Sequence, residues 1–147
     1  MLFHDFVQLR IGAVSVAAIC VVLALAIGIV KAPPRVQRYG TVIMLKPETL
    51  AYYKELHAAV WPSVLKKIKE CHIRNYSIYL KEIEAGKIYL FAYFEYTGDD
   101  YAADMARMAA DPETQRWWKE TDPCQAPIPL RGDKEWWSRM DEVFHLD

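Results

Sequence analysis

The sequence predicts an α+β domain with the element order β-α-β-β-α-β, preceded by an apolar N-terminal segment. Stretches rich in β-branched and aromatic residues, one of them alternating at a period of two, are separated by stretches with helical spacing. A short turn, Glu84-Ala85-Gly86-Lys87, joins two of the expected strands as a hairpin. The 147 residues suffice for one domain with a substantial core and are too few for two ordinary domains.

Residues Ile11 to Val30 carry no charge and consist mainly of Ile, Val, Leu and Ala. A helix of this length spans about 30 Å, the thickness of the hydrocarbon core of a bilayer. More Lys and Arg residues follow this stretch than precede it, which favours a cytoplasmic location for the C-terminal domain. We therefore expect residues 1–37 to be a membrane anchor and linker. The alternatives are a signal peptide cleaved near Ala24-Leu25-Ala26 and a wrongly assigned start codon, which would leave a soluble cytoplasmic protein.

The domain itself, residues 38–147, is expected to open with a strand over Gln37–Lys46, a stretch rich in β-branched and aromatic side chains. A helix follows, because Pro47 suits a first helical turn and an acidic residue after it favours the positive end of a helix. Pro62 lacks a backbone donor and is expected to kink or restart this helix.

Strict alternation predicts the next strand over Ile73–Glu82, with Ile73 and Tyr76 on opposite faces, and the hairpin partner follows over Ile88–Tyr96. Two helices come next, one from Asp99 or Asp100 to about Ala110 and one that opens at Asp111-Pro112. A proline-rich loop then leads to a last strand candidate at Glu142–Leu146. This order is the split βαβ pattern of ferredoxin-like domains.

Composition excludes several classes of function. The net charge is −1 and there is no basic block, which argues against a nucleic-acid partner. The three cysteines, Cys20, Cys71 and Cys124, are an odd number without CxxC spacing, which argues against a disulfide framework or a zinc site. We expect neither a metal nor a cofactor.

Three aromatic residues form a candidate site. Tyr53, His57 and Trp61 lie at i, i+4 and i+8, so that on one helix their side chains share a face. A phenol, an imidazole and an indole together offer a hydroxyl, a group that titrates near neutrality and a flat apolar surface, which suit a sugar or another small polyol. The alternative is that residues at this spacing only pack in the core.

Four motifs follow one another along the chain at compatible spacing. They are Tyr53-x3-His57-x3-Trp61-Pro62, Asn75-Tyr76-Ser77-Ile78-Tyr79-Leu80, Gln115-Arg116-Trp117-Trp118-Lys119 and Glu142-Val143-Phe144-His145-Leu146. Together they closely resemble the L-rhamnose mutarotase family, from Arg38 to the C-terminus. The resemblance implies a dimeric α/β barrel of ferredoxin-like subunits. It also implies an isomerase that interconverts the α and β anomers of L-rhamnopyranose without metal or nucleotide.

The resemblance also implies roles for individual residues. His57 matches the proton donor of the family, and the sugar-binding positions match Tyr53, Tyr76, Trp117 and Trp118. The sequence departs from the family in its N-terminal extension, in Arg74 where some members carry His, and in the charged turn from Lys81 to Lys87. Because Tyr76 and Tyr79 fall on opposite faces of their strand, at most one of them is expected to line a pocket.

The chemistry suits these residues. Mutarotation opens a hemiacetal, and an imidazole with an ordinary pKa of about 6.5 can give and take the proton that this requires. The alternative function is that of another dimeric α/β-barrel protein, either a small monooxygenase-like enzyme or a non-catalytic sugar-binding module.

A sheet of four short strands leaves one face open, so we expect a homodimer in which a second subunit covers it. Trp136 and Trp137 are expected to pack in the core or to form dimer contacts. With the anchor in place, the catalytic domain would face the cytoplasm.

Overall fold

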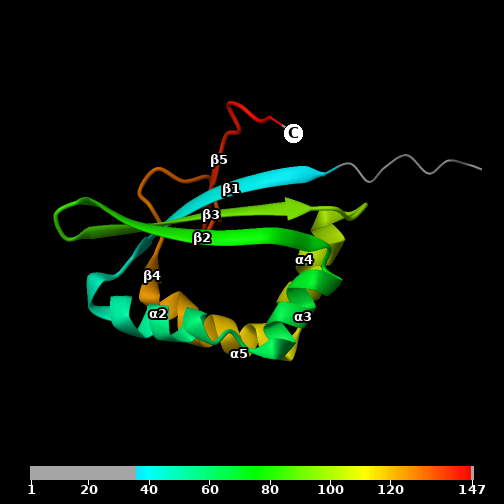
Figure 1. Ribbon diagram of the computed structural model, residues 1–147, viewed down its shortest axis with the longest axis horizontal. Coiled ribbons are helices and arrows are strands. Elements are labelled where there is room, and N and C mark those ends of the chain that lie inside the picture. Colours follow the sequence, from blue (N-terminus) through cyan, green and yellow to red (C-terminus); the bar gives the residue numbers. More distant parts are fainter. Residues whose placement is uncertain (1–35, 147) are drawn as a thin grey trace, which may run out of the picture. The chain divides into compact units, whose positions relative to one another are not determined.

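The computed structural model describes residues 36–146, and the predicted anchor at Ile11–Val30 lies outside this range. None of the helices within residues 36–146 is long and apolar enough to cross a membrane. The described chain is a mixed α+β domain, as predicted, with four α-helices on one face of a curled antiparallel sheet (Figure 1).

Three long strands make up most of the sheet, in the spatial order β2-β3-β1. They are β1 (Gln37–Leu45), β2 (Ile73–Glu84) and β3 (Lys87–Tyr96). Two short strands pair with the other edge of β1: β4 (Gln125–Ala126) and β5 (Ser138–Met140). The hairpin between β2 and β3 turns at Gly86, whose φ of 73° lies in the left-handed region that glycine adopts without strain.

The four helices are α2 (Leu50–Ala58), α3 (Pro62–Glu70), α4 (Tyr101–Ala109) and α5 (Pro112–Thr121), with short 3-10 turns at η1 (Pro47–Thr49) and η2 (Asp122–Cys124). Aspartates cap two of the helices as expected: Asp100 accepts a hydrogen bond from the Ala103 amide, and Asp111 accepts one from Thr114. All four helices lie on the same face of the sheet (Figure 1).

Tyr53, His57 and Trp61 were predicted to share one face of a single helix, and this prediction is wrong for Trp61. Helix α2 ends at Ala58 and α3 begins at Pro62, as the restart at this proline predicts. Trp61 is extended, with φ −59° and ψ 134°, because a residue before proline is disfavoured in the helical conformation. Trp61 is therefore the N-cap of α3 and not part of the face that α2 presents.

A β-bulge interrupts the strict alternation predicted for β2. Arg74 pairs with Glu95 and Ser77 pairs with Tyr93, so two residues of β2 stand opposite the single residue Phe94. Asn75, with a φ of 49°, absorbs the extra residue, since Asn tolerates the left-handed region better than most residues. As a result Ile73 and Tyr76 face the same side of the sheet, not opposite sides as predicted.

The last strand also differs from its prediction. Residues 141–146 form no regular structure, and the strand that pairs with β1 is β5, just before them. Val143 is 95% exposed and Phe144 is 80% exposed. The predicted strand at Glu142–Leu146 is thus wrong: within residues 36–146 this segment joins no sheet.

The core consists of two clusters at opposite ends of the sheet. One gathers around the end of β1 and the start of β3: Ile43, Leu45, Tyr53, Ile88, Leu90 and Cys124. The other gathers around the opposite ends of these strands: Tyr39, Ile73 and Tyr96, with Tyr101, Met105 and Met108 of α4 packed against them. The space between the two clusters holds the cavity described next.

Candidate active site

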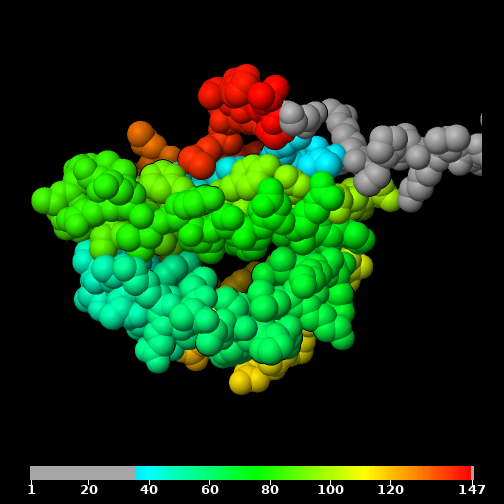
Figure 2. Space-filling view, viewed as in Figure 1, coloured from blue at the N-terminus to red at the C-terminus, as the bar shows by residue number. Residues whose placement is uncertain are grey.

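A deep hollow lies between the inner face of the sheet and the helices. It consists of two adjoining spaces of about 750 and 520 Å³ that share much of their lining. The hollow opens between β2 and the two helices α2 and α3, as the space-filling view shows (Figure 2). Both spaces are lined by Tyr53, His57, Val64, Ile68, Ile73, Tyr76, Ile78 and Trp117. All five residues that the sequence predicts for the site line the smaller space, called the inner space below, and four of them, all but Trp118, also line the wider space.

Helix α2 positions Tyr53 and His57 one turn apart on its inner face. Their rings are stacked, with centroids 4.1 Å apart and planes at 28°. Trp117 of α5 meets the imidazole edge-on at 5.4 Å. Because Tyr53 and Trp117 are both buried, at 4% and 7% exposure, they hold the His57 ring in place from two sides.

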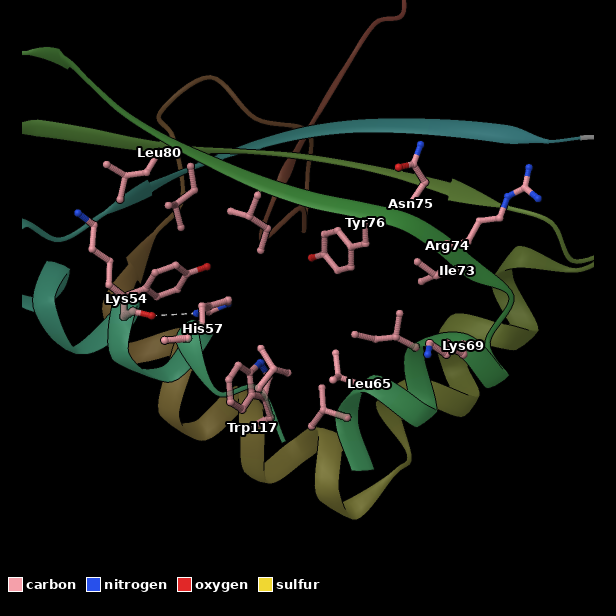
Figure 3. Close-up of a pocket in the computed structure, with 17 residues that line it drawn as sticks. Lys54, His57, Leu65, Lys69, Ile73, Arg74, Asn75, Tyr76, Leu80 and Trp117 are labelled. Atoms are coloured by element: carbon pink, nitrogen blue, oxygen red, sulfur yellow. Dashed lines mark hydrogen bonds between the residues drawn. The ribbon is translucent and has the colours of Figure 1, made fainter. Parts of the chain in front are cut away.

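A hydrogen bond sets the tautomer of His57. Its Nδ1 lies 2.9 Å from the backbone carbonyl of Tyr53 (dashed line, Figure 3). A carbonyl oxygen can only accept, so Nδ1 carries the hydrogen and donates it, and in the neutral ring Nε2 keeps its lone pair. Burial lowers the pKa of His57 below its ordinary value. His57 is therefore a neutral base at pH 7, with Nε2 as its basic atom.

The bulge in β2 directs Tyr76 into the cavity. In the close-up Tyr76 points inward, whereas Arg74 and Asn75 point away (Figure 3). On the outer side both of these residues bind Glu95, through Arg74 Nε at 2.8 Å and Asn75 Nδ2 at 3.0 Å. Tyr79 is 64% exposed and lines neither space, so of the two tyrosines only Tyr76 lines the hollow, as predicted.

Two tyrosine hydroxyls of the site remain protonated. Burial, and to a smaller extent the neighbouring Tyr101, raises the pKa of Tyr76 to about 12, although 44% of the residue is accessible through the open hollow. Burial also raises the pKa of Tyr53, and a side-chain hydrogen bond with Gln125 offsets part of this rise. Both phenols are therefore hydrogen-bond donors at neutral pH.

The two adjacent indoles of α5 have different surroundings. Trp117 packs against His57 and, edge-on at 5.3 Å, against Trp61. Trp118 is 37% exposed and lines the inner space. Consecutive residues of a helix point about 100° apart, so one ring supports His57 while the other borders the space beside it.

Sequence reasoning missed three residues of the inner space: Asp122, Gln125 and Trp136. Gln125 is 5% exposed, and its Oε1 accepts a hydrogen bond from Trp136 Nε1 at 2.9 Å. No motif marks Gln125 or Trp136, because they belong to the irregular segment after α5. Asp122 did carry a signal, since it follows Trp118 at the helical spacing of four residues.

Much of the remaining lining of the wider space is aliphatic, although Lys54, Lys69, Arg74 and Asn75 also border it. The wider space near the mouth is bordered by Val60, Val64, Leu65, Ile68, Ile73, Ile78, Leu80 and Leu90. The hollow therefore combines a base and hydroxyl donors, which border both spaces, with aliphatic walls in the wider space. Such a site suits a small polyol that carries one apolar group.

Comparisons with known proteins agree with this geometry. A family model described as L-rhamnose mutarotase matches residues 38–146. The L-rhamnose mutarotase of Mesorhizobium japonicum is 33% identical over 116 residues, which cover 75% of this chain and 97% of that protein. The L-rhamnose mutarotase of Phocaeicola vulgatus is 30% identical over 111 residues, covering 71% of this chain and 93% of that protein.

The fold has a counterpart among solved structures. A crystal structure of an L-rhamnose mutarotase from Formosa agariphila matches with a TM-score of 0.56 and 21% sequence identity, covering 76% of this chain and 99% of that one. This likeness concerns the fold, whereas the family model and the two relatives extend over almost the whole described domain. The chain belongs to the L-rhamnose mutarotase family.

Proposed function

We infer that the chain is an L-rhamnose mutarotase, an isomerase of sugar anomers, and we propose that it works in the hollow between the sheet and the helices. The observation that carries this assignment of the site is the hydrogen bond from His57 Nδ1 to the Tyr53 carbonyl. It leaves a neutral base at Nε2 among aromatic rings and phenol donors, as the opening of a hemiacetal requires.

The proposed reaction moves two protons. Nε2 of His57 takes the proton from the anomeric hydroxyl O1, the bond between C1 and the ring oxygen O5 breaks, and O5 gains a proton. The open aldehyde turns about the bond between C1 and C2, and O5 attacks the other face of C1 while the protons return. A positioned acid–base group contributes about 10²–10⁴-fold to such a step.

The other residues of the site support binding of the sugar. We propose that the hydroxyls of Tyr53 and Tyr76 donate hydrogen bonds to sugar oxygens and that the indoles of Trp117 and Trp118 contact its C–H groups, because all four residues line the inner space. The aliphatic walls suit the methyl group that a 6-deoxy sugar such as rhamnose carries in place of a hydroxymethyl group. A hydroxymethyl group packed against these aliphatic side chains would lose its water without gaining a hydrogen bond from them.

The experiment that tests the proposal is anomer exchange measured by saturation-transfer NMR. The wild-type protein should speed exchange between α- and β-L-rhamnose, and His57→Asn should slow the catalysed exchange by about 10²-fold or more while the melting temperature stays close to that of the wild type. Fucose, mannose and galactose serve as comparison sugars. Exchange at the wild-type rate in a folded His57→Asn protein would remove His57 from the mechanism.

We also propose a homodimer that completes an α/β barrel, and a membrane anchor at Ile11–Val30. The outer face of the sheet and the tail that follows β5 present exposed apolar side chains, among them Tyr79, Met140 and Phe144, which a second copy would cover.

The uncharged composition of Ile11–Val30 supports anchoring, with the domain on the cytoplasmic side. Resistance of the full-length chain to carbonate extraction from membranes tests the anchor.

A further inference from the structure

The inner space contains a carboxyl group that the proposed reaction has not yet used. Asp122 lines this space together with Tyr53, His57 and Trp118. Among residues 36–146 its side chain has neither a hydrogen-bond donor nor a cation as a partner. Other partly buried aspartates differ in this respect: Asp104 accepts from His72 and Tyr96, and Asp111 caps α5.

The backbone around Asp122 is held on both sides. Its amide donates to the carbonyl of Trp118 at the end of α5, and its own carbonyl accepts the amide of Gln125. Lys46, at the end of β1, donates from Nζ to the carbonyl of Pro123 at 2.7 Å. Asp122 is thus presented to the inner space from a well-supported position, one helical turn after Trp118.

The reaction calls for a second group that exchanges protons. Ring opening removes a proton at O1 and adds one at O5, and His57 offers one nitrogen for this, because Nδ1 is bound to the Tyr53 carbonyl. The phenols of Tyr53 and Tyr76 are poor proton donors, since burial raises the pKa of each. Among the described residues that line the inner space, Asp122 is the only carboxyl group.

We propose that Asp122 is the second acid–base residue of the mutarotase reaction and gives its proton to the ring oxygen. In the opening step the protonated carboxyl donates to O5 as the C1–O5 bond breaks, Nε2 of His57 takes the proton of O1, and C1 and O1 become a carbonyl. In the closing step O5 attacks C1, Asp122 takes back the proton of O5, and the imidazolium returns a proton to O1. Protons and electron pairs balance, and no co-reactant is required.

The surroundings of Asp122 favour the form that this step uses. Burial raises the pKa of Asp122 and so favours the protonated carboxyl. In the inner space it shares the lining with His57 and Tyr53 of α2. Asp122 also lines a recess on the protein surface, and two cationic residues, Lys46 and Lys119, line the same recess. The Lys46 ammonium is engaged by the neighbouring carbonyl of Pro123.

The inference rests on the proposed function and is tested with Asp122→Asn, which keeps the shape of the side chain and removes its titratable proton. We expect kcat for L-rhamnose exchange to fall by about 10²-fold, KM to change less than about threefold, and the melting temperature to stay unchanged because no hydrogen bond is lost. Asp133→Asn is the matched control, an exposed aspartate that lines none of the spaces described. It should behave as the wild type.

A second variant tests the proton directly. In Asp122→Ala, added formate should restore part of the lost exchange rate, and it should accelerate neither the wild type nor Asp133→Asn. The inference is overturned by an Asp122→Asn protein with wild-type kcat, by a rise in KM alone, or by unfolding of both Asp122 variants, which would assign a structural role. An inactive wild type would instead overturn the proposed function itself.

Discussion

At the scale of single residues, His57 illustrates how a backbone contact decides chemistry. The i, i+4 spacing that stacks the imidazole on Tyr53 also brings Nδ1 to the carbonyl of that same residue. One helical turn therefore sets both the orientation and the tautomer of the base. The resemblance to the family predicts a proton donor at this position. In the proposed reaction the neutral His57 first accepts the proton of O1 and only then acts as a donor.

The lowered pKa of His57 has a direct consequence for activity. A base works in its deprotonated form, and burial keeps His57 deprotonated below its ordinary pKa of about 6.5. We expect kcat/KM to remain high as pH falls below 6.5 and to decline only as pH passes through the lowered pKa. Rates measured between pH 4.5 and pH 8, corrected for uncatalysed exchange, check this. An acid limb centred at or above pH 6.5 would contradict it.

The two tyrosines of the site should respond differently to loss of their hydroxyls. Tyr76 points into the cavity, so Tyr76→Phe should weaken sugar binding by about 0.5–1.5 kcal/mol and leave the free energy of unfolding nearly unchanged. Tyr53→Phe should weaken binding similarly and also lower the free energy of unfolding by about 1 kcal/mol, because it removes the hydrogen bond between Tyr53 and the buried side chain of Gln125. Thermal unfolding and sugar titration of the two variants, side by side, measure both effects.

At the scale of elements, the bulge in β2 decides which side chains reach the cavity. Without the extra residue, Ile73 and Tyr76 would face opposite sides of the sheet, and either the core or the site would lose a member. Arg74 and Asn75 hold the bulge through Glu95 on the outer face.

Two substitutions of Asn75 distinguish its left-handed backbone conformation from its hydrogen bond to Glu95 as the feature that maintains the bulge. Asn75→Val should lower the free energy of unfolding by about 1–3 kcal/mol and raise KM, because a β-branched residue resists a φ of 49°. Asn75→Gly accepts this φ and loses only the bond to Glu95, so its KM should stay near that of the wild type. Equal KM values for the two variants would show that the bulge does not position Tyr76.

Part of this architecture could be predicted from the sequence. Propensity and periodicity placed β1, β2 and β3 within a few residues, and Pro47, Pro62 and Pro112 marked where helices begin. Alternation alone cannot reveal a bulge, since it depends on Glu95 of the neighbouring strand.

The irregular segment after α5 was harder to predict. Gln125 reaches the site through non-local contacts with Tyr53 and Trp136, and such contacts leave no periodic pattern in the sequence. Among its residues only Asp122, one helical turn after Trp118, carried a signal that could have placed it in the site.

At the scale of the whole molecule, the segment after β5 pairs with no strand within residues 36–146. Its family-like motif ends the chain with exposed apolar side chains, including Phe144 at 80% exposure. A single subunit gives no reason for such a segment, and burial of one Phe side chain contributes about 1.5–3 kcal/mol. This supports the proposal that a second copy covers it.

The dimer can be tested by charge insertion in the fragment 38–147. Phe144→Glu should weaken the dimer by about 10-fold to 100-fold, because it replaces an apolar contact by a charge that must lose its water. Leu130→Glu is the control, a loop residue that is 91% exposed. Sedimentation at micromolar concentration compares the two with the parent fragment. A parent fragment that sediments as a monomer would contradict the dimer, and an unchanged Phe144→Glu dimer would exclude the tail from it.

The cavity between the two core clusters links the stability of the enzyme to the concentration of its sugar. A sugar bound in the cavity between the two clusters would make dispersion contacts with its walls. A ligand at one hundred times its Kd stabilises the folded state by about 2.7 kcal/mol. We therefore expect protein with bound sugar to unfold less often and to be degraded more slowly than protein without it. The steady-state amount of enzyme should therefore rise with the supply of the sugar, without any change in transcription.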